Sequence, residues 1–166
     1  MGSNSSVNPV KVLSLAQLTN ANLSTTARLN LALFSLESGV PISTLNEIEG
    51  LIPYSLYPDQ PVYWLGGITR SSIVEAIIKY GCTVDQIIDR ARLASNNLDP
   101  GARVRLAILS IKTGKPMSLI NQIAMNVPSS FQANSYWLSS KNRVQIVETM
   151  IALGYAPSED TAASQN

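Results

Sequence analysis

Few residues in this sequence are of the types that carry common enzyme chemistry. Histidine is absent, which excludes an imidazole general base, a histidine-containing triad and histidine metal ligands. The single cysteine, Cys82, excludes an intrachain disulfide and a multi-cysteine zinc site. No glycine-rich phosphate loop or nucleophile elbow is present. We therefore predict a protein that is not an enzyme and that holds no metal or cofactor.

Two arginines and two glutamates recur at matched places in the two halves of the chain. They are Arg28 and Arg103, and Glu75 and Glu148. We interpret them as one structural ion pair in each half, joining the first helix of a repeat to the third. A catalytic carboxylate is the less favoured alternative, because both copies keep the residue.

Aromatic residues form the main group of candidate contact residues. A Tyr-Trp pair stands before the third predicted helix of each repeat, and two further tyrosines stand upstream in the first. Either these side chains seat a loop on the core, or they bind a partner, since Tyr and Trp contribute strongly to interfaces. The candidates are Tyr54, Tyr57, Tyr63, Trp64, Tyr136 and Trp137.

One basic cluster lies on both sides of the turn between the two repeats. Its partner-contact candidates are Arg90, Arg92 and Arg105, with Arg103 beside them. These arginines are either solvated helix ends paired with neighbouring aspartates or a contact for an anionic partner.

The elements that position these residues occur twice. Residues 27–53 and 102–128 are identical at 11 of 27 positions with an offset of 75. Residues 63–81 and 136–154 are identical at 9 of 19 positions with an offset of 73. Because the blocks keep their order and spacing, we interpret the chain as a tandem duplication of a unit of about 75 residues.

The apolar spacing within each repeat predicts helices. Apolar residues at i, i+3, i+4 and i+7 begin each repeat, and Gly39 or Gly114 then ends the helix in a left-handed conformation. We predict an all-α fold in which each repeat contains two helix–Gly–turn–helix hairpins, the second closing at Gly81 or Gly154. Strand patterns are weak, and the short β-favouring stretches 10–15 and 61–65 are interpreted as irregular or helical. Residues 54–62 and 129–135 are expected to be loops. We predict that the repeats pack around a pseudo-two-fold axis.

The predicted organisation has three parts. Residues 1–24 form an arm that is disordered or holds one short helix, 25–97 form the first repeat, and 98–166 form the second repeat with a polar tail. No apolar run is long enough to span a bilayer, and the N-terminus lacks the features of a secretion signal, so a cytoplasmic location is expected. The N-terminal residues formally match a myristoylation pattern, which we interpret as coincidental because no basic run follows.

Charge and composition favour a protein that works through contacts with other chains. Twelve basic and eleven acidic residues give a net charge of +1, and charged residues are 14% of the chain. We expect a structural or assembly protein that associates with itself or with another protein. One alternative is a module that binds a small apolar ligand, with the aromatic loops as lids. A second is a nucleic-acid-binding regulator, disfavoured because residues 43–50 and 118–125 contain no Lys or Arg.

Overall fold

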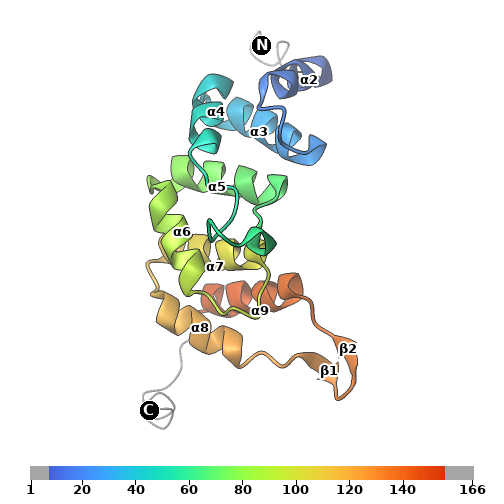
Figure 1. The fold of residues 1–166 in the computed structure, drawn as a ribbon, viewed down its shortest axis with the longest axis vertical. Coiled ribbons are helices and arrows are strands. Elements are labelled where there is room, and N and C mark those ends of the chain that lie inside the picture. The colour runs from blue at the N-terminus through green and yellow to red at the C-terminus, as the bar shows by residue number, and fades with distance from the viewer. Residues whose placement is uncertain (1–7, 156–166) are drawn as a thin grey trace. The chain divides into compact units, whose positions relative to one another are not determined.

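The protein is mostly helical. The computed structural model describes residues 8–155, which contain eight α-helices, a 3-10 turn and one two-stranded antiparallel sheet (Figure 1). By its internal contacts the chain divides into two units, Met1–Gln86 and Ile87–Asn166. The predicted tail at 156–166 and the myristoylation pattern lie outside the described residues.

The first unit contains four α-helices and the 3-10 turn. They are α2 (Pro9–Leu18), α3 (Thr25–Ser38), α4 (Ile42–Gly50), η1 (Pro61–Tyr63) and α5 (Gly67–Tyr80). Helix α3 is the centre of this unit, because it contacts α2, α4 and α5. The Ser24 side chain caps its first turn by accepting from Ala27 N, and Gly39 ends it with a φ of 77°.

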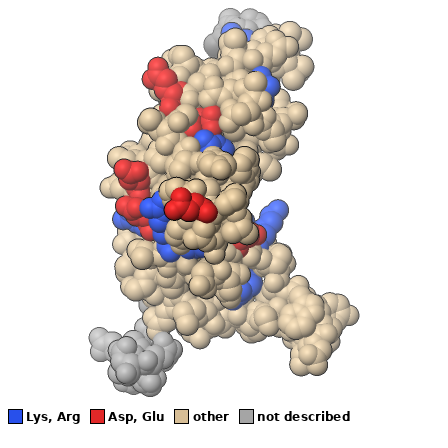
Figure 2. Space-filling model, in the orientation of Figure 1, with Lys and Arg blue, Asp and Glu red and all other residues tan. Residues whose placement is uncertain are grey.

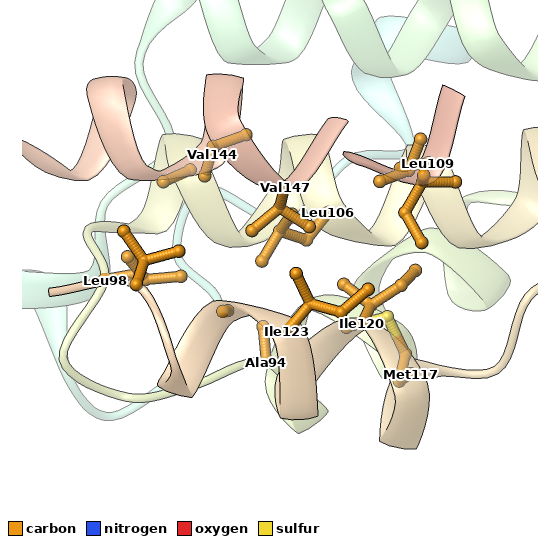
Figure 3. Close-up of a cluster of buried hydrophobic side chains, with 13 residues drawn as sticks. Ala94, Leu98, Leu106, Leu109, Met117, Ile120, Ile123, Val144 and Val147 are labelled. Atoms are coloured by element: carbon orange, nitrogen blue, oxygen red, sulfur yellow. The ribbon is translucent and has the colours of Figure 1, made fainter. Parts of the chain in front are cut away.

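The second unit repeats this order and adds a small sheet. Its elements are α6 (Val84–Leu93, which begins at the end of the first unit), α7 (Pro100–Thr113), α8 (Met117–Met125), β1 (Ser130–Gln132), β2 (Ser135–Trp137) and α9 (Ser140–Ala152). Side chains from α7, α8 and α9 converge on one apolar cluster, to which Ala94 and Leu98 also belong (Figure 3). Leu106, Ile120 and Val147 lie at its centre and are buried.

The helix pairs α3–α4 and α7–α8 are alike in detail. The first helices have 14 residues each and the second helices have nine. Gly114 ends α7 with a φ of 76°, one degree from the value at Gly39. In both turns a serine hydroxyl donates to a carbonyl oxygen five residues later at 2.6 Å, Ser35 to Val40 and Ser110 to Lys115.

The helix that precedes each of these pairs is also matched. Arg28 Nε donates to Ala16 O at 3.2 Å, and Arg103 Nε donates to Ala91 O at 3.0 Å. Donor and acceptor are both displaced by 75 residues, so α6 stands before α7 as α2 stands before α3. The sequence prediction instead made α6 the fourth helix of the first repeat and ended that repeat at residue 97. Only two of ten residues are identical between α2 and α6, which is why the sequence pattern did not align them.

The β1–β2 hairpin corrects the expectation of an all-α fold with a loop at 129–135. Ser130 pairs with Trp137 and Gln132 pairs with Ser135 across a two-residue turn. Asn134 in that turn has a φ of 70°, a conformation that asparagine tolerates better than most residues. Strands of three residues are too short to give a clear alternating pattern, so the sequence did not reveal them.

Candidate functional site

A buried ion pair holds the start of the aromatic loop in the first unit. Arg70 Nε lies 2.6 Å from Glu49 Oε2, and both residues are buried. The same guanidinium donates to the carbonyl oxygens of Glu49, Ile52 and Pro53 at 2.9 to 3.0 Å. The other carboxylate oxygen of Glu49 accepts from Asn20 Nδ2 at 2.6 Å. This cluster, the Arg70–Glu49 clamp, therefore fixes the chain between the end of α4 and the loop.

The first aromatic loop, residues 54–65, is closed by its own hydrogen bonds. Leu56 N donates to Tyr63 O at 3.0 Å, and Leu65 N donates to Tyr54 O at 2.9 Å. The side chains of both leucines are buried and anchor the loop. The buried Ser55 hydroxyl lies 2.9 Å from Tyr57 O and 2.8 Å from Gln60 O.

The aromatic side chains of this loop pack on one another in edge-to-face pairs. The ring centroids of Tyr54 and Trp64 are 5.1 Å apart, and those of Tyr57 and Tyr63 are 4.8 Å apart. Such pairs add about 0.5–1.5 kcal/mol each beyond the area they bury. The four aromatic candidates of the first unit therefore stabilise their own loop, although Tyr54 and Trp64 remain exposed on their outer sides.

The second unit lacks the carboxylate of this clamp. Arg143 stands where Arg70 stands, but Ala124 occupies the position of Glu49 at the offset of 75. Arg143 Nη2 donates to Ala124 O at 3.4 Å, and its buried Nε has no acceptor within residues 8–155. The start of the second aromatic loop is therefore held by far weaker contacts.

The second aromatic loop projects its large side chains outward. It forms the β1–β2 hairpin, which extends away from the helices of its unit (Figure 1). Phe131, Tyr136 and Trp137 are 78%, 65% and 66% exposed. Tyr136 has a φ of 58°, which costs a non-glycine residue about 1–3 kcal/mol. Strain of this size is compatible with a surface whose shape matters more than its stability.

A groove of about 580 Å³ runs between the hairpin and helix α9. One wall is aromatic and apolar, and the other is the face of α9 that repeats at i, i+3, i+4, i+7 and i+8. The lining residues are Phe131, Tyr136, Trp137, Leu138, Asn142, Gln145, Ile146, Thr149 and Met150. Residues 129–140 contain no charged side chain, and Figure 2 shows none on the hairpin in the face in view. We call this surface the hairpin–α9 groove.

The arginine candidates do not converge on a site for an anion. Arg90 Nε donates to the Ser110 hydroxyl at 3.3 Å, and Arg92 lies 3.8 Å from Asp89 on the same helix. Arg105 grips Glu148 with two donors, Nε reaching Oε2 at 3.2 Å. Of these three contacts, that of Arg92 is local to one helix, that of Arg90 joins α6 to α7, and that of Arg105 joins α7 to α9.

The matched arginines and glutamates have different partners from those predicted. Arg28 donates to backbone oxygens of the α2 end and to Thr19 Oγ1 at 2.9 Å, and the buried Arg103 donates to the end of α6. Glu148 pairs with Arg105 rather than Arg103, so α7 and α9 are joined through a neighbouring position. Glu75 lies 4.0 Å from Lys79, one turn along α5. Partial burial raises the pKa of Glu75, which Lys79 lowers and Glu37 raises further.

The sequence analysis did not identify Glu49 as part of a cluster, and it left Phe131 out of the contact candidates. Glu49 is an acidic residue with alanine at its counterpart, whereas its partner arginine is matched in both units. This difference between Glu49 and Ala124 was the one feature of the sequence that could have indicated that the two loops are held differently. Phe131 belongs to a hairpin that the sequence did not predict.

Neither a cluster of potential metal ligands nor a membrane-spanning helix is found in the described part of the chain. No group of three or more potential metal-ligating residues occurs within residues 8–155. No helix in that range is both long and apolar enough to cross a membrane. No protein-family model, curated protein or solved structure matches the chain.

Proposed function

We propose that this chain is a non-enzymatic helical assembly protein that binds other protein chains, including copies of itself, through the hairpin–α9 groove. The observation that carries the proposal is the outward display of Phe131, Tyr136 and Trp137 beside an uncharged groove. Contiguous apolar surface of this kind marks interaction sites, and Tyr and Trp are enriched among the residues that dominate binding energy.

The contrast between the loops supports this assignment. The first loop holds its four aromatic rings in two edge-to-face pairs with centroids 4.8 and 5.1 Å apart. The second loop has one looser pair, Phe131 with Tyr136 at 6.1 Å, and leaves its three large rings more exposed, on a strained hairpin. A side chain whose only role is to seat a loop gains nothing from such exposure. A contact surface for another protein needs it.

The duplication is part of the same proposal. Two units descended from one ancestral helical unit would start with the same clamp and the same loop, and loss of the carboxylate in one would release its loop for binding. The paired contacts of Arg28 and Arg103 support a common origin. The pseudo-two-fold relation between the units stays a prediction.

Light scattering on a sizing column, over a range of concentrations, tests the proposal. We expect the molar mass to exceed the chain mass of 17.9 kDa and to rise with concentration. Trp137→Ala should shift the protein toward the monomer, whereas the matched control Trp64→Ala should not. Both tryptophans are exposed, so the fold should survive either change, which circular dichroism verifies.

A monomer of 17.9 kDa at several hundred micromolar would overturn self-association. The groove volume of about 580 Å³ also falls in the range of about 300–1,000 Å³ found for small-molecule sites, which favours an apolar ligand as the second candidate. An environment-sensitive apolar dye separates the two. Stoichiometric dye binding to a monomer, lost in Trp137→Ala, would favour the ligand.

A further inference from the structure

Helix α2 leaves apolar residues uncovered that its counterpart α6 does not. No residue of α2 is buried, and Val10 and Leu13 are exposed. At the offset of 75, Leu13 corresponds to Ile88, and their exposed fractions are 56% and 3%. Apart from Leu93 at its end, the exposed positions of α6 are polar, and Asp85 stands where α2 has Val10. Helix α2 thus has apolar residues of the kind that are usually buried, but in this structure they are exposed.

Helix α9 shows the complementary deficiency. Ile146 is 36% exposed and lines the hairpin–α9 groove, whereas its counterpart Ile73 on α5, at the offset of 73, is fully buried. Thr149 is exposed, and its counterpart Ala76 is buried. The face of α5 that contains Ile73 and Ala76 is therefore buried, whereas the equivalent face of α9 is exposed.

The sequence that follows each helix differs in the corresponding way. Three residues after α5, the chain continues into α6, whose Ile87 and Ile88 are buried. After α9, residues 156–166 contain no apolar side chain larger than alanine except Pro157. Residues 156–166 therefore contain no apolar stripe like that of α6, whereas α2 has uncovered apolar residues.

We propose that α2 of one copy of the chain packs into the hairpin–α9 groove of a second copy, so that copies associate head to tail. Val10 and Leu13 would enter the groove beside Ile146 and the aromatic side chains, a helix-in-groove contact. The groove walls are uncharged, and Lys11 is the only charged residue of α2, so little charge is desolvated. Because the two surfaces differ, the association is open-ended unless it closes into a ring.

This inference rests on the self-association proposed above and specifies its geometry. Three single variants test it by light scattering: Leu13→Glu on α2, Ile146→Glu in the groove, and Leu51→Glu as a control. Leu51 is exposed and apolar but belongs to neither surface. Each charge at the interface should turn the oligomer into a monomer, whereas Leu51→Glu should leave the mass distribution unchanged.

Mixing the two monomeric variants gives the decisive result. Leu13→Glu keeps an intact groove and Ile146→Glu keeps an intact α2, so together they should form a complex of two chains and nothing longer. Val10→Glu and Thr149→Arg, both at exposed positions, repeat the test if either first variant fails to fold by circular dichroism.

The outcomes separate the inference from the function on which it rests. If the wild type is oligomeric but any other pattern is seen, including an unaffected Leu13→Glu or no complex on mixing, then α2 does not occupy the groove. The assembly function would stand in that case. If the wild type is monomeric at every concentration, both fail.

Discussion

The two aromatic loops of this chain follow equivalent helices, yet one is held by a buried ion pair and the other has no such clamp. In the first unit Arg70 has a buried carboxylate and three backbone carbonyls as acceptors, and the loop that follows is closed on itself. In the second, Arg143 has one long hydrogen bond, and the loop becomes an exposed hairpin.

We propose that one side chain, the carboxylate of Glu49, accounts for the difference between the two loops. Arginine carries five donors and binds a carboxylate and carbonyls together only when all are in place. With Glu49 present, the guanidinium organises residues 49–53. With Ala124 in the equivalent place, Arg143 keeps a single long side-chain hydrogen bond among the described residues, to Ala124 O.

Removing the carboxylate of the clamp is the largest test of this comparison. We expect Glu49→Ala to lower the free energy of unfolding by about 3–5 kcal/mol, because it leaves the buried guanidinium of Arg70 without its counter-charge. Urea denaturation followed by circular dichroism measures the change. Glu47→Ala on the same helix is the control, because Glu47 is exposed and should matter by less than about 0.5 kcal/mol. Equal losses in the two variants would show that the clamp does not stabilise the first unit.

Much of the helical framework could be predicted from sequence, because apolar spacing and turn glycines are local. The helices ending at Gly39, Gly81 and Gly114 were expected. Gly39 and Gly114 have the predicted left-handed conformation, and Gly81 also adopts it. The equivalence of α6 and α2 was not evident from the sequence, because few of their residues are identical. The two helices resemble each other in the backbone oxygens that accept hydrogen bonds from Arg28 and Arg103.

The candidate site was predicted only in part, because its asymmetry is a tertiary property. The Tyr-Trp pairs are identical in sequence, but the residue that distinguishes them, Glu49, lies 21 residues before Arg70 and acts through space. Likewise Arg105 rather than Arg103 reaches Glu148, because the burial of Arg103 directs it to the end of α6. Spacing along a helix limits which arginines could reach a given glutamate, but it does not determine which of them does.

Restoring the clamp in the second unit is the next largest test. Ala124→Glu places a carboxylate where Arg143 Nε lacks an acceptor. Ala124 is buried, so the single variant also includes a packing and desolvation cost. A double-mutant cycle with Arg143→Gln removes that cost, and we expect a favourable coupling of about 1–3 kcal/mol. A coupling near zero would mean that the missing carboxylate does not explain the difference between the loops.

The smallest expected effects concern the matched glutamates. Replacing Glu148 by Gln should lower the stability of the fold, whereas replacing Glu75 by Gln should raise it. Glu148→Gln should destabilise at neutral pH by up to about 1 kcal/mol, because it breaks the pair with Arg105. Glu75 has no arginine in the place of Arg105, where Asn30 stands at the offset of 75, and its ion pair is the 4.0 Å contact with Lys79. Burial raises the pKa of Glu75 above its ordinary value of 4.5, so ionisation costs more in the folded state than in the unfolded state.

The sign for Glu75 follows from proton linkage. The folded state holds the proton more tightly, so this glutamate destabilises the fold fully above its raised pKa and not at all below 4.5. Glu75→Gln should therefore stabilise at pH 7 by a few tenths of a kcal/mol, of the size of other surface effects, and the gain should vanish as the pH falls below 4.5. Thermal unfolding at pH 7 and pH 4 checks both variants. A loss of stability in Glu75→Gln at pH 7 would mean that its contact with Lys79 outweighs its burial, and that the two glutamates play equivalent roles after all.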